Sequence, residues 1–230
     1  MNARTVLITG GSSGIGAETA RRLLVDGYQI AVTGRSKDKL ATFLDDVGRP
    51  DELLGITADA ADWESTQAAV ASTVERFGQL NAVVANAGFT SADTITDGDP
   101  DLWRVMVLTN VLGPALLAKA ALPHLQATSG RLLLVGSVAG FKNAPGNLYS
   151  ATKWAVTGLA ENIRMQMTSL GVGVTLIAPG MTETPFWRDG SAPPITLSAT
   201  AVAETIHFAL SQPPGVDINT LVVRPIGQSI

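Results

Sequence analysis

The sequence predicts a single α/β domain over residues 1–230, built on a parallel, doubly wound sheet with helices on both faces. Short apolar runs alternate with amphipathic helical stretches along the whole chain, which is typical of such sheets. The first apolar run ends in a glycine-rich turn that leads into a helix. A length of 230 residues with 46% hydrophobic residues suits one core.

Composition narrows the range of partners. The net charge of −4 and the absence of a basic cluster give no indication of a nucleic acid or membrane partner. The chain has no cysteine, which removes disulfides, thiol nucleophiles and thiolate metal sites. The longest apolar stretch, 115–125, is interrupted by Lys119 and Pro123, and residues 1–4 leave no room for a signal peptide. We therefore expect a soluble cytoplasmic protein.

The first predicted strand, 5–8, is a continuous apolar run followed by the segment TGGSSGIG and a helix. In this context Gly10 permits a tight turn, Gly14 lets the backbone approach a phosphate, and Gly16 lets the helix pack on the strand. The helix N-terminus offers N–H groups and a positive dipole end to a pyrophosphate. The segment therefore predicts a dinucleotide-binding turn. The same turn supplies three further predicted cofactor contacts, Ser12, Ser13 and Ile15.

The second predicted strand, 28–33, ends in Gly34-Arg35-Ser36. An acidic residue at this strand end binds the ribose hydroxyls of NAD, whereas an arginine accommodates the 2′-phosphate of NADP. The acidic residue is missing and Arg35 is present, and a guanidinium can bind a phosphate through two hydrogen bonds. The sequence therefore favours NADP(H) over NAD(H). The alternative is that Arg35 is a solvated loop residue.

The next elements alternate in the same way. Ser36 caps a helix that runs to Asp46, a strand over 53–58 ends at Asp59, and Asp62 caps a helix that ends at Gly78. The fourth strand is followed by the small residues Asn86-Ala87-Gly88, which let another molecule approach the backbone. The alternative for Asn86 is an ordinary turn residue.

A long helix is predicted from Asp99-Pro100 to about Gln126, with an interruption at Gly113-Pro114. Proline removes a backbone hydrogen bond and clashes with the preceding turn, so a kink or irregular turn is expected. A carbonyl near Asn110 then lacks its usual partner. We expect an unusual geometry at Asn110 with its side chain free; the alternative is a polar residue that faces solvent.

The fifth strand, 131–135, ends in Gly136-Ser137, and the carboxyl ends of strands are where open α/β sheets bind ligands. A helix follows from Tyr149 to about Leu170, and a strand over 172–178 ends in Pro179-Gly180. Residues 182–197 are predicted to be an irregular substrate loop. The last elements are a helix from Ser198 to Leu210 and a strand over 220–223.

Tyr149 and Lys153 are four residues apart, which places them on one face of a helix. A phenol titrates near pH ~10 in water, and a neighbouring cation lowers its pKa. A tyrosine tuned in this way can exchange a proton with an alcohol or carbonyl oxygen. The alternative is an ordinary surface pair.

With these residues together, the chain resembles the classical short-chain dehydrogenases/reductases over essentially its whole length. The matching motifs occur in family order and spacing: Thr9-Gly10-x3-Gly14-x-Gly16, Asp59, Asn86-Ala87-Gly88, Asn110, Ser137, Tyr149-x3-Lys153, and Pro179-Gly180 followed by Thr184. The resemblance implies a Rossmann-type, seven-stranded sheet in the order 3-2-1-4-5-6-7, with the cofactor across the switch point. It also implies a homotetramer or dimer, and the Gly34-Arg35 pair is similar to the NADP-preferring branch. Ala85 stands where the family often has a second asparagine, a departure expected to be harmless.

The resemblance also implies roles for individual residues. Tyr149 is the acid/base, Ser137 orients the substrate oxygen, and Lys153 lowers the tyrosine pKa and holds the nicotinamide ribose. Asn110 supports a water that links Lys153 to solvent. Asp59 and Ala60 lie by the adenine, and residues 86–88 line the cofactor cleft. Thr182 and Thr184 are expected near the carboxamide and phosphates, and Pro179 and Gly180 are further expected cofactor contacts.

The substrate region is less specific. The segment between Thr184 and Ser198 is short for a substrate lid, which indicates an open or small pocket. The expected apolar wall residues are Phe89, Phe141, Met181, Phe186 and Trp187. Lys142 and Arg188 are candidates to meet an anionic substrate, although solvated surface charge is the favoured interpretation.

The predicted function is transfer of a hydride between NADP(H) and the carbonyl or secondary alcohol of a small substrate. All four catalytic positions are filled, which disfavours the alternative of a catalytically silent NADP(H)-binding regulatory protein on the same fold. An epimerase is disfavoured because little sequence follows Gly180. No metal is implied, since His124 and His207 lack ligand spacing around them.

Overall fold

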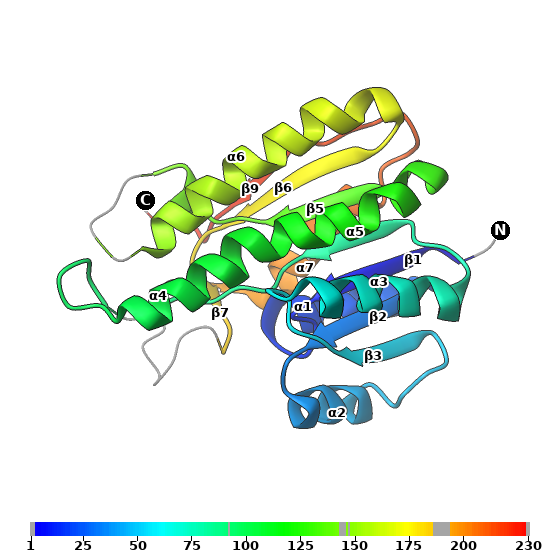
Figure 1. Cartoon of the computed structure of the whole chain (residues 1–230), viewed down its shortest axis with the longest axis horizontal. Coiled ribbons are helices and arrows are strands. Elements are labelled where there is room, and N and C mark those ends of the chain that lie inside the picture. The colour runs from blue at the N-terminus through cyan, green and yellow to red at the C-terminus, as the bar shows by residue number, and fades with distance from the viewer. Residues whose placement is uncertain (1–2, 92, 143–145, 147, 186–193, 229–230) are drawn as a thin grey trace.

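The computed structural model describes residues 3–91, 93–142, 146, 148–185 and 194–228. Its main sheet is parallel and seven-stranded, in the order β3-β2-β1-β4-β5-β6-β9 (Figure 1), as predicted. The strands are β1 (Thr5–Thr9), β2 (Gln29–Gly34), β3 (Leu53–Thr57), β4 (Ala82–Ala85), β5 (Arg131–Val135), β6 (Gly173–Pro179) and β9 (Thr220–Val223). The order reverses between β1 and β4, so the carboxyl ends of these strands form the crevice where open α/β sheets bind ligands.

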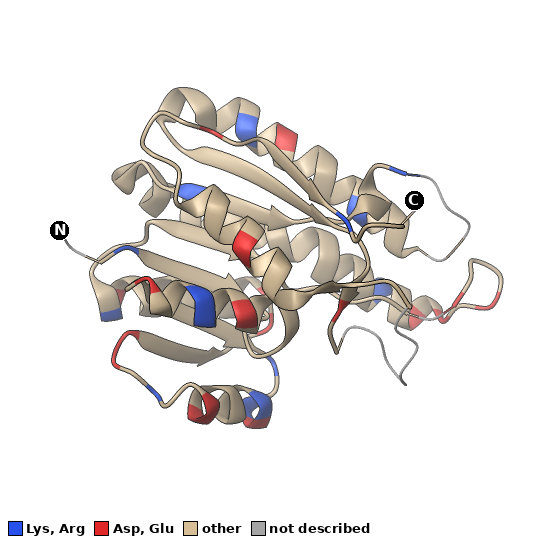
Figure 2. Ribbon diagram, turned by 180° about the vertical axis from the view of Figure 1, so that it is seen from behind, with Lys and Arg blue, Asp and Glu red and all other residues tan. Residues whose placement is uncertain are grey.

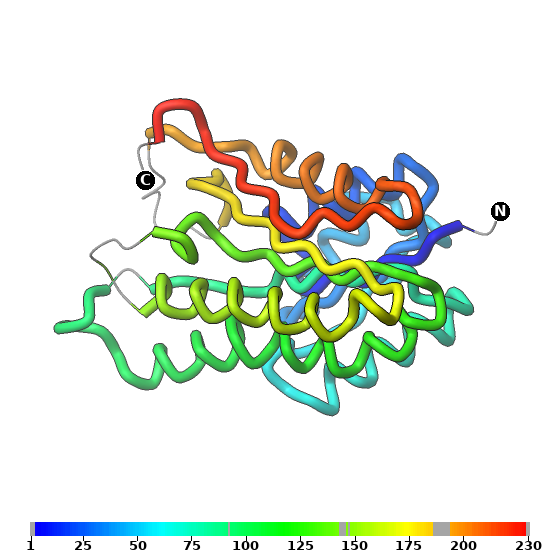
Figure 3. The backbone as a smooth tube through the Cα atoms, turned by 90° about the horizontal axis from the view of Figure 1, so that it is seen from above, coloured from blue at the N-terminus to red at the C-terminus, as the bar shows by residue number. Residues whose placement is uncertain are grey.

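Helices cover both faces of this sheet. They are α1 (Gly14–Val25), α2 (Lys37–Asp46), α3 (Trp63–Phe77), α4 (Pro100–Val107), α5 (Gly113–Thr128), α6 (Tyr149–Met167) and α7 (Ala199–Leu210), with short turns η2 (Val138–Gly140) and η3 (Thr168–Leu170). Side chains of α1, α2 and α7 form the core on one face, and those of α3, α5 and α6 form it on the other. Figure 3 shows α7 on one side of the sheet and the long helices α5 and α6 on the other.

Strand β1 shows why the sheet has two cores. All five of its residues are buried, with Val6 and Ile8 in the core under α1 and α7, and Leu7 in the core under α5 and α6. Successive strand residues point to opposite faces, so a strand covered on both sides needs a continuous apolar run. This is the pattern from which the strand was predicted.

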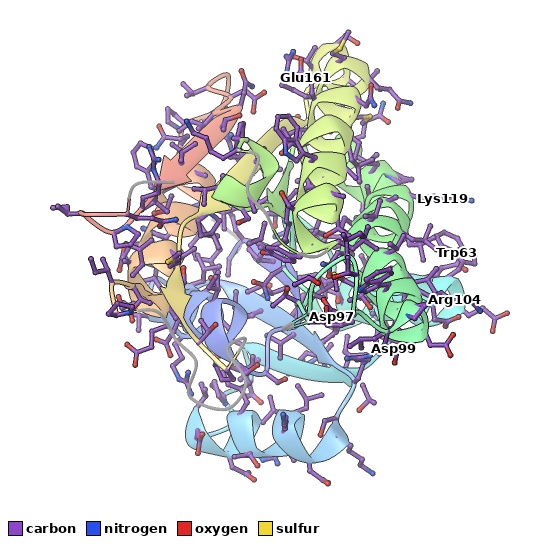
Figure 4. The ribbon with its side chains drawn as sticks, turned by 90° about the vertical axis from the view of Figure 1, so that its left-hand side faces the viewer. Trp63, Asp97, Asp99, Arg104, Lys119 and Glu161 are labelled. Atoms are coloured by element: carbon purple, nitrogen blue, oxygen red, sulfur yellow. The ribbon has the colours of Figure 1, made fainter. Side chains whose placement is uncertain are left out.

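The predicted helix caps are present. The Ser36 hydroxyl accepts a hydrogen bond from the Lys39 N–H, and the Asp62 carboxylate accepts one from the Ser65 N–H. Gly78 ends α3 in the left-handed region at φ 78°, which favours glycine. Trp63, at the start of α3, lies under the Lys119 ammonium of α5, 4.7 Å from Nζ to the ring centroid (Figure 4). This contact joins the outer surfaces of the two helices.

The predicted irregularity near Pro114 is a π-helix, η1 (Leu108–Leu112), between α4 and α5. The Gly113 N–H reaches back five residues to the Leu108 carbonyl. Pro114 has no N–H to give to the Asn110 carbonyl, so a wider turn replaces the regular hydrogen bond there. Thr109 and Asn110 are buried within this turn.

The continuous stretch Pro100–Thr128 is long and apolar enough to span a membrane by length and composition alone. Its apolar residues have another use in this fold. Leu117, Ala121 and Leu125 of α5 are 1%, 0% and 0% exposed, in the core under the sheet. The apolar residues of this stretch are therefore explained by its packing as a core helix of the domain.

The predicted irregular loop over 182–197 starts and ends in short strands. β7 (Thr182–Glu183) pairs in parallel with β8 (Leu197–Ser198) as a separate two-stranded ribbon. Sequence reasoning missed it because each strand has two residues and no alternation to detect. The seventh strand of the main sheet is β9 for this reason.

Figure 2 shows Lys and Arg residues interspersed with Asp and Glu residues along the helices and connecting segments visible from this side. One network joins α1 to α7: Arg22 pairs with Asp26 and Glu204, and the Asp26 carboxylate lies 2.6 Å from His207 Nε2. His207, predicted to be an ordinary helix residue, lies in α7 and contacts this network through its imidazole.

Candidate active site

A cavity of about 600 Å³ lies at the carboxyl ends of the central strands. Nearly all of the predicted site residues, which come from distant parts of the chain, line this cavity. Those that line it are Gly10, Ser12, Ser13, Gly14, Ile15, Arg35, Asp59, Ala60, Asn86, Ala87, Gly88, Ser137, Tyr149, Lys153, Pro179, Gly180, Thr182 and Thr184. Gly16 and Asn110 are not among the residues that line it. The cavity therefore has the location expected for a ligand at the switch point of the sheet.

The glycine turn between β1 and α1 forms one wall. Gly10 and Gly14 have φ of +65° and +53°, a region that L side chains rarely adopt. A Cβ on Gly14 would lie 3.2 Å from Thr184 Cβ, and a Cβ on Gly16 would lie 2.5 Å from the Gly10 carbonyl oxygen. The absence of a side chain at Gly16 therefore lets α1 approach the residue that directly follows β1.

Asn86 fixes this turn from the neighbouring strand. Its Nδ2 donates hydrogen bonds to the carbonyls of Thr9 (2.9 Å) and Gly10 (3.2 Å). The Thr9 hydroxyl in return accepts hydrogen bonds from the N–H groups of Asn86 and Ala87, both at 3.1 Å. Asn86 is thus more than an ordinary turn residue, because it ties the end of β4 to the glycine turn. These bonds shape a cradle of backbone N–H groups that suits a phosphate.

At one end of the cavity lie two cations. Arg35 follows β2, and Lys39 lies in the first turn of α2; both are exposed residues that line the cavity. Within the described residues, neither forms an ion pair with a carboxylate. Sequence reasoning missed Lys39, although the cap at Ser36 fixes where the first turn of α2 lies. Asp59 faces the same end, and its carboxylate accepts a hydrogen bond from the Ala61 N–H at 2.9 Å.

At the other end, Ser137 and Tyr149 meet. Ser137 follows β5, and Tyr149 is the first residue of α6; the two side chains are hydrogen-bonded to each other. Ser137 Oγ also accepts a hydrogen bond from the Ala139 N–H at 3.1 Å, which orients the hydroxyl. The predicted meeting of strand-end serine and helix tyrosine in one cavity is therefore present.

Lys153 lies one turn after Tyr149, on the same face of α6. Its side chain is 6% exposed, and Nζ donates a hydrogen bond to the Val135 carbonyl at 2.9 Å. Nζ lies 5.6 Å from the centroid of the Tyr149 ring. The pair is therefore inside the site and is not a surface pair.

Burial sets the protonation of both groups. It raises the pKa of the Tyr149 phenol to about 12, although the hydrogen bond with Ser137 acts in the opposite direction. It lowers the pKa of the Lys153 ammonium to about 8. The expected lowering of the tyrosine pKa by Lys153 is not seen here, because desolvation is the larger effect and Nζ bonds to Val135. At neutral pH the phenol keeps its proton and is suited to donate it.

Asn110 differs from expectation. Its side chain, expected to be free, donates hydrogen bonds from Nδ2 to the Phe89 carbonyl (2.9 Å) and Thr152 Oγ1 (3.1 Å). Its Oδ1 accepts a hydrogen bond from the Phe89 N–H at 3.0 Å. Asn110 therefore joins the segment after β4 to α6, next to Lys153.

The neighbouring Thr109 was not predicted, and no local sequence signal marks it. Its side chain is 6% exposed and lines the cavity, and Thr109 Oγ1 has no hydrogen-bond partner among the described residues. A buried polar group of this kind costs free energy unless something pairs with it. Together with the glycine cradle, it is an observation that fits a polar ligand such as a dinucleotide.

The substrate end is partly apolar. Phe89 and Met181 line the cavity as predicted, whereas Phe141 does not. The exposed Lys142, for which solvated surface charge was the favoured interpretation, also lines it. The remaining expected residues, Phe186, Trp187 and Arg188, lie outside the described residues. Val138, Ala139 and Gln228 are among the lining residues that were not predicted.

Comparisons with known proteins agree with this geometry. The family model described as short chain dehydrogenase matches residues 4–193. An uncharacterized oxidoreductase of Staphylococcus haemolyticus is 34% identical over 229 residues, covering 98% of this chain and 99% of the relative.

Solved structures agree as well. An alcohol dehydrogenase from the archaeon Thermococcus sibiricus, complexed with 5-hydroxy-NADP, superposes with a TM-score of 0.90 at 28% identity, covering 100% of this chain and 99% of that one. ElxO with NADP bound superposes with a TM-score of 0.86 at 26% identity, covering 96% and 97%.

Proposed function

The chain belongs to the short-chain dehydrogenase family, and from that premise we propose that it is an NADP(H)-dependent oxidoreductase acting on a carbonyl or secondary alcohol. The observation that carries the proposal is the convergence of Ser137, Tyr149 and Lys153 in the cavity that the glycine turn also lines. The named relatives and neighbours are oxidoreductases or NADP complexes, which supports the same class.

The cofactor would lie across the ends of β1 and β4. The glycine turn would hold the pyrophosphate, and Asp59, Ala60 and the hydroxyl of Thr109 would lie along the adenosine half. The bound nicotinamide supplies the hydride that is exchanged with the substrate carbon. The four residues Pro179, Gly180, Thr182 and Thr184 would line the nicotinamide end.

This chain's own residues handle the proton. In the direction of reduction, the Tyr149 hydroxyl donates its proton to the carbonyl oxygen as that oxygen gains negative charge. Ser137 holds the phenol and the substrate oxygen in place. The positive charge of Lys153 stabilises the phenolate that remains. Asn110 contributes by fixing the position of α6 relative to residue Phe89.

The direct experiment is to follow NADPH oxidation by the purified protein with a panel of small ketones and aldehydes. Consumption of NADPH that depends on the carbonyl compound supports the enzyme. The second candidate is a catalytically silent NADP(H)-binding protein, for which NADPH would bind without being consumed. The hydrogen-bonded Ser137–Tyr149 pair and the clustered Lys153 favour the enzyme.

The pH dependence of reduction follows from the pKa values of the site. The reactive form has Tyr149 protonated and Lys153 charged, and Lys153 loses its charge above pH about 8. We predict that kcat/KM for reduction is level below about pH 8 and falls as the pH rises further. The measurement is kcat/KM against pH with NADPH saturating.

A matched control identifies the group. Lys153→Arg replaces an amine of lowered pKa with a guanidinium that stays charged at all accessible pH values. The fall above about pH 8 should disappear in this variant, whatever its residual rate. A profile of wild type that is level through this region would contradict the role of Lys153.

The assembly and location belong to the same proposal. Family resemblance implies a homotetramer or dimer, and the large apolar side chains Val105, Leu112 and Trp154 on α4, η1 and α6 are 40%, 40% and 44% exposed. Such exposure supports an interface between copies of the chain. A cytoplasmic location and a small-molecule substrate complete the proposal.

A further inference from the structure

The C-terminal tail after β9 returns to the cavity. Arg224 follows β9, and the Gln228 N–H donates a hydrogen bond to the Pro225 carbonyl at 3.1 Å, which closes a turn. Gly227 within this turn has φ +95°. The turn places the side chain of Gln228 in the cavity wall, beside the segment Gly180–Thr182. No motif in the sequence predicts this, because it depends on a contact between segments 47 residues apart.

The peptide groups of Met181 are held from two sides. Its N–H donates a hydrogen bond to Gln228 Oε1 at 3.0 Å. Its carbonyl accepts a hydrogen bond from the Leu197 N–H at 2.8 Å, where the ribbon of β7 and β8 closes. The preceding Gly180 N–H donates to the Val223 carbonyl at 2.7 Å, which continues the ladder between β6 and β9. Two side chains take part in the backbone bonds of this segment: Gln228 accepts from the Met181 N–H, and the Thr182 hydroxyl donates to the Gly180 carbonyl at 3.0 Å.

The absence of a side chain at Gly180 leaves room for the residues that follow β9. A Cβ at this position would overlap Gln228 Oε1 and would lie 3.0 Å from Arg224 Cγ and from Pro225 Cδ. Gly180 does not have a positive φ, so its backbone conformation does not require glycine. The absence of a side chain here lets the tail approach the end of β6 closely.

We propose that Gln228 is a positioning residue: its amide oxygen fixes the Met181 peptide, and through it the backbone of Gly180–Thr182, at the nicotinamide end of the site. That this segment lines a nicotinamide site rests on the proposed function. If the segment is already ordered, binding of the nicotinamide half does not include the free-energy cost of ordering it, so the affinity for the cofactor is higher. The C-terminal tail is then a part of the active site.

The first test needs no cofactor. Amide hydrogen exchange is measured residue by residue in wild type, in Gln228→Leu, which keeps the size but loses the acceptor oxygen, and in Gln228→Glu, which keeps an acceptor oxygen. The Met181 amide should exchange roughly 2- to 10-fold faster in the leucine variant, which is the change that the loss of one hydrogen bond produces. It should stay protected in the glutamate variant. The Gly180 amide, bonded to Val223, is the internal control.

The second test measures cofactor binding. Gln228→Leu should raise the Kd for NADPH about 5-fold with an unchanged unfolding midpoint. The control is Gln212→Leu, since the Gln212 side chain also hydrogen-bonds the backbone, donating from Nε2 to the Phe208 carbonyl, but lies outside the cavity. Gly180→Ala should have the same effect as Gln228→Leu, because its Cβ displaces the Gln228 amide.

Each result decides the proposal. Unchanged Met181 exchange in Gln228→Leu would overturn it, as would faster Met181 exchange with an unaltered Kd for NADPH. Failure of wild type itself to bind NADPH would overturn the proposed function instead. In that case the exchange measurement still decides whether Gln228 fixes Met181.

Discussion

Replacing Tyr149 by phenylalanine is expected to lower kcat for carbonyl reduction by about 1,000-fold or more, a loss within the range for a removed general acid. The variant loses one oxygen atom and keeps the ring. The Kd for NADPH should stay within about twofold of wild type, because the glycine turn and the cations at the other end of the cavity are untouched. Steady-state kinetics and a fluorescence titration on the same preparation measure both quantities.

The chain carries a matched control in its other tyrosine. Tyr28 is 4% exposed in the core, and its hydroxyl has no partner among the described residues. Tyr28→Phe removes the same atom far from the cavity and should leave kcat unchanged. Retained turnover in Tyr149→Phe would show that another group donates the proton.

Reversing the charge of Arg35 is expected to have the second large effect. Arg35→Asp should lower the ratio of kcat/KM with NADPH to kcat/KM with NADH by roughly 100-fold, because a charge-assisted pair is replaced by a repulsion. Lys39 lies at the same end of the cavity, so some preference for NADPH should remain in the single variant. Adding Lys39→Asp should remove it. The measurement is the ratio of kcat/KM values for the two cofactors.

Lys37→Asp is the control for this prediction. Lys37 is exposed at the start of α2 and does not line the cavity. The same reversal of charge there should change the cofactor ratio by less than about twofold, which is the size of a distant, screened charge effect. If Arg35→Asp and Lys37→Asp had equal effects, general surface charge would explain the preference and Arg35 would be no specific contact.

Sequence reasoning succeeded where local chemistry decides the structure. The buried strands were predicted from unbroken apolar runs such as 5–8, and the seven-stranded order came from the resemblance to the family. The irregular turn before Pro114 was predicted because a proline nitrogen cannot donate a hydrogen bond. The sequence also predicted which residues meet at the strand ends, since parallel strands end at one edge of the sheet.

The remaining features depend on contacts between distant segments. The Asn110 side chain bonds to Phe89 and Thr152, neither of which is close in sequence. The raised pKa of Tyr149 depends on how completely the fold surrounds the phenol. Gln228 reaches the cavity only because β9 and β6 are neighbours in the sheet. None of these can be deduced from residue spacing, because each is a property of tertiary packing.

Titration of the purified protein with NADPH and with NADH, followed by nicotinamide fluorescence, tests the central claim most directly. The cavity, its glycine cradle and the cations Arg35 and Lys39 predict that both cofactors bind and that NADPH binds at least about 10-fold more tightly. Equal or tighter binding of NADH would contradict the role of the two cations. Binding of neither cofactor would contradict the assignment of the cavity as a dinucleotide site, and with it the proposed oxidoreductase.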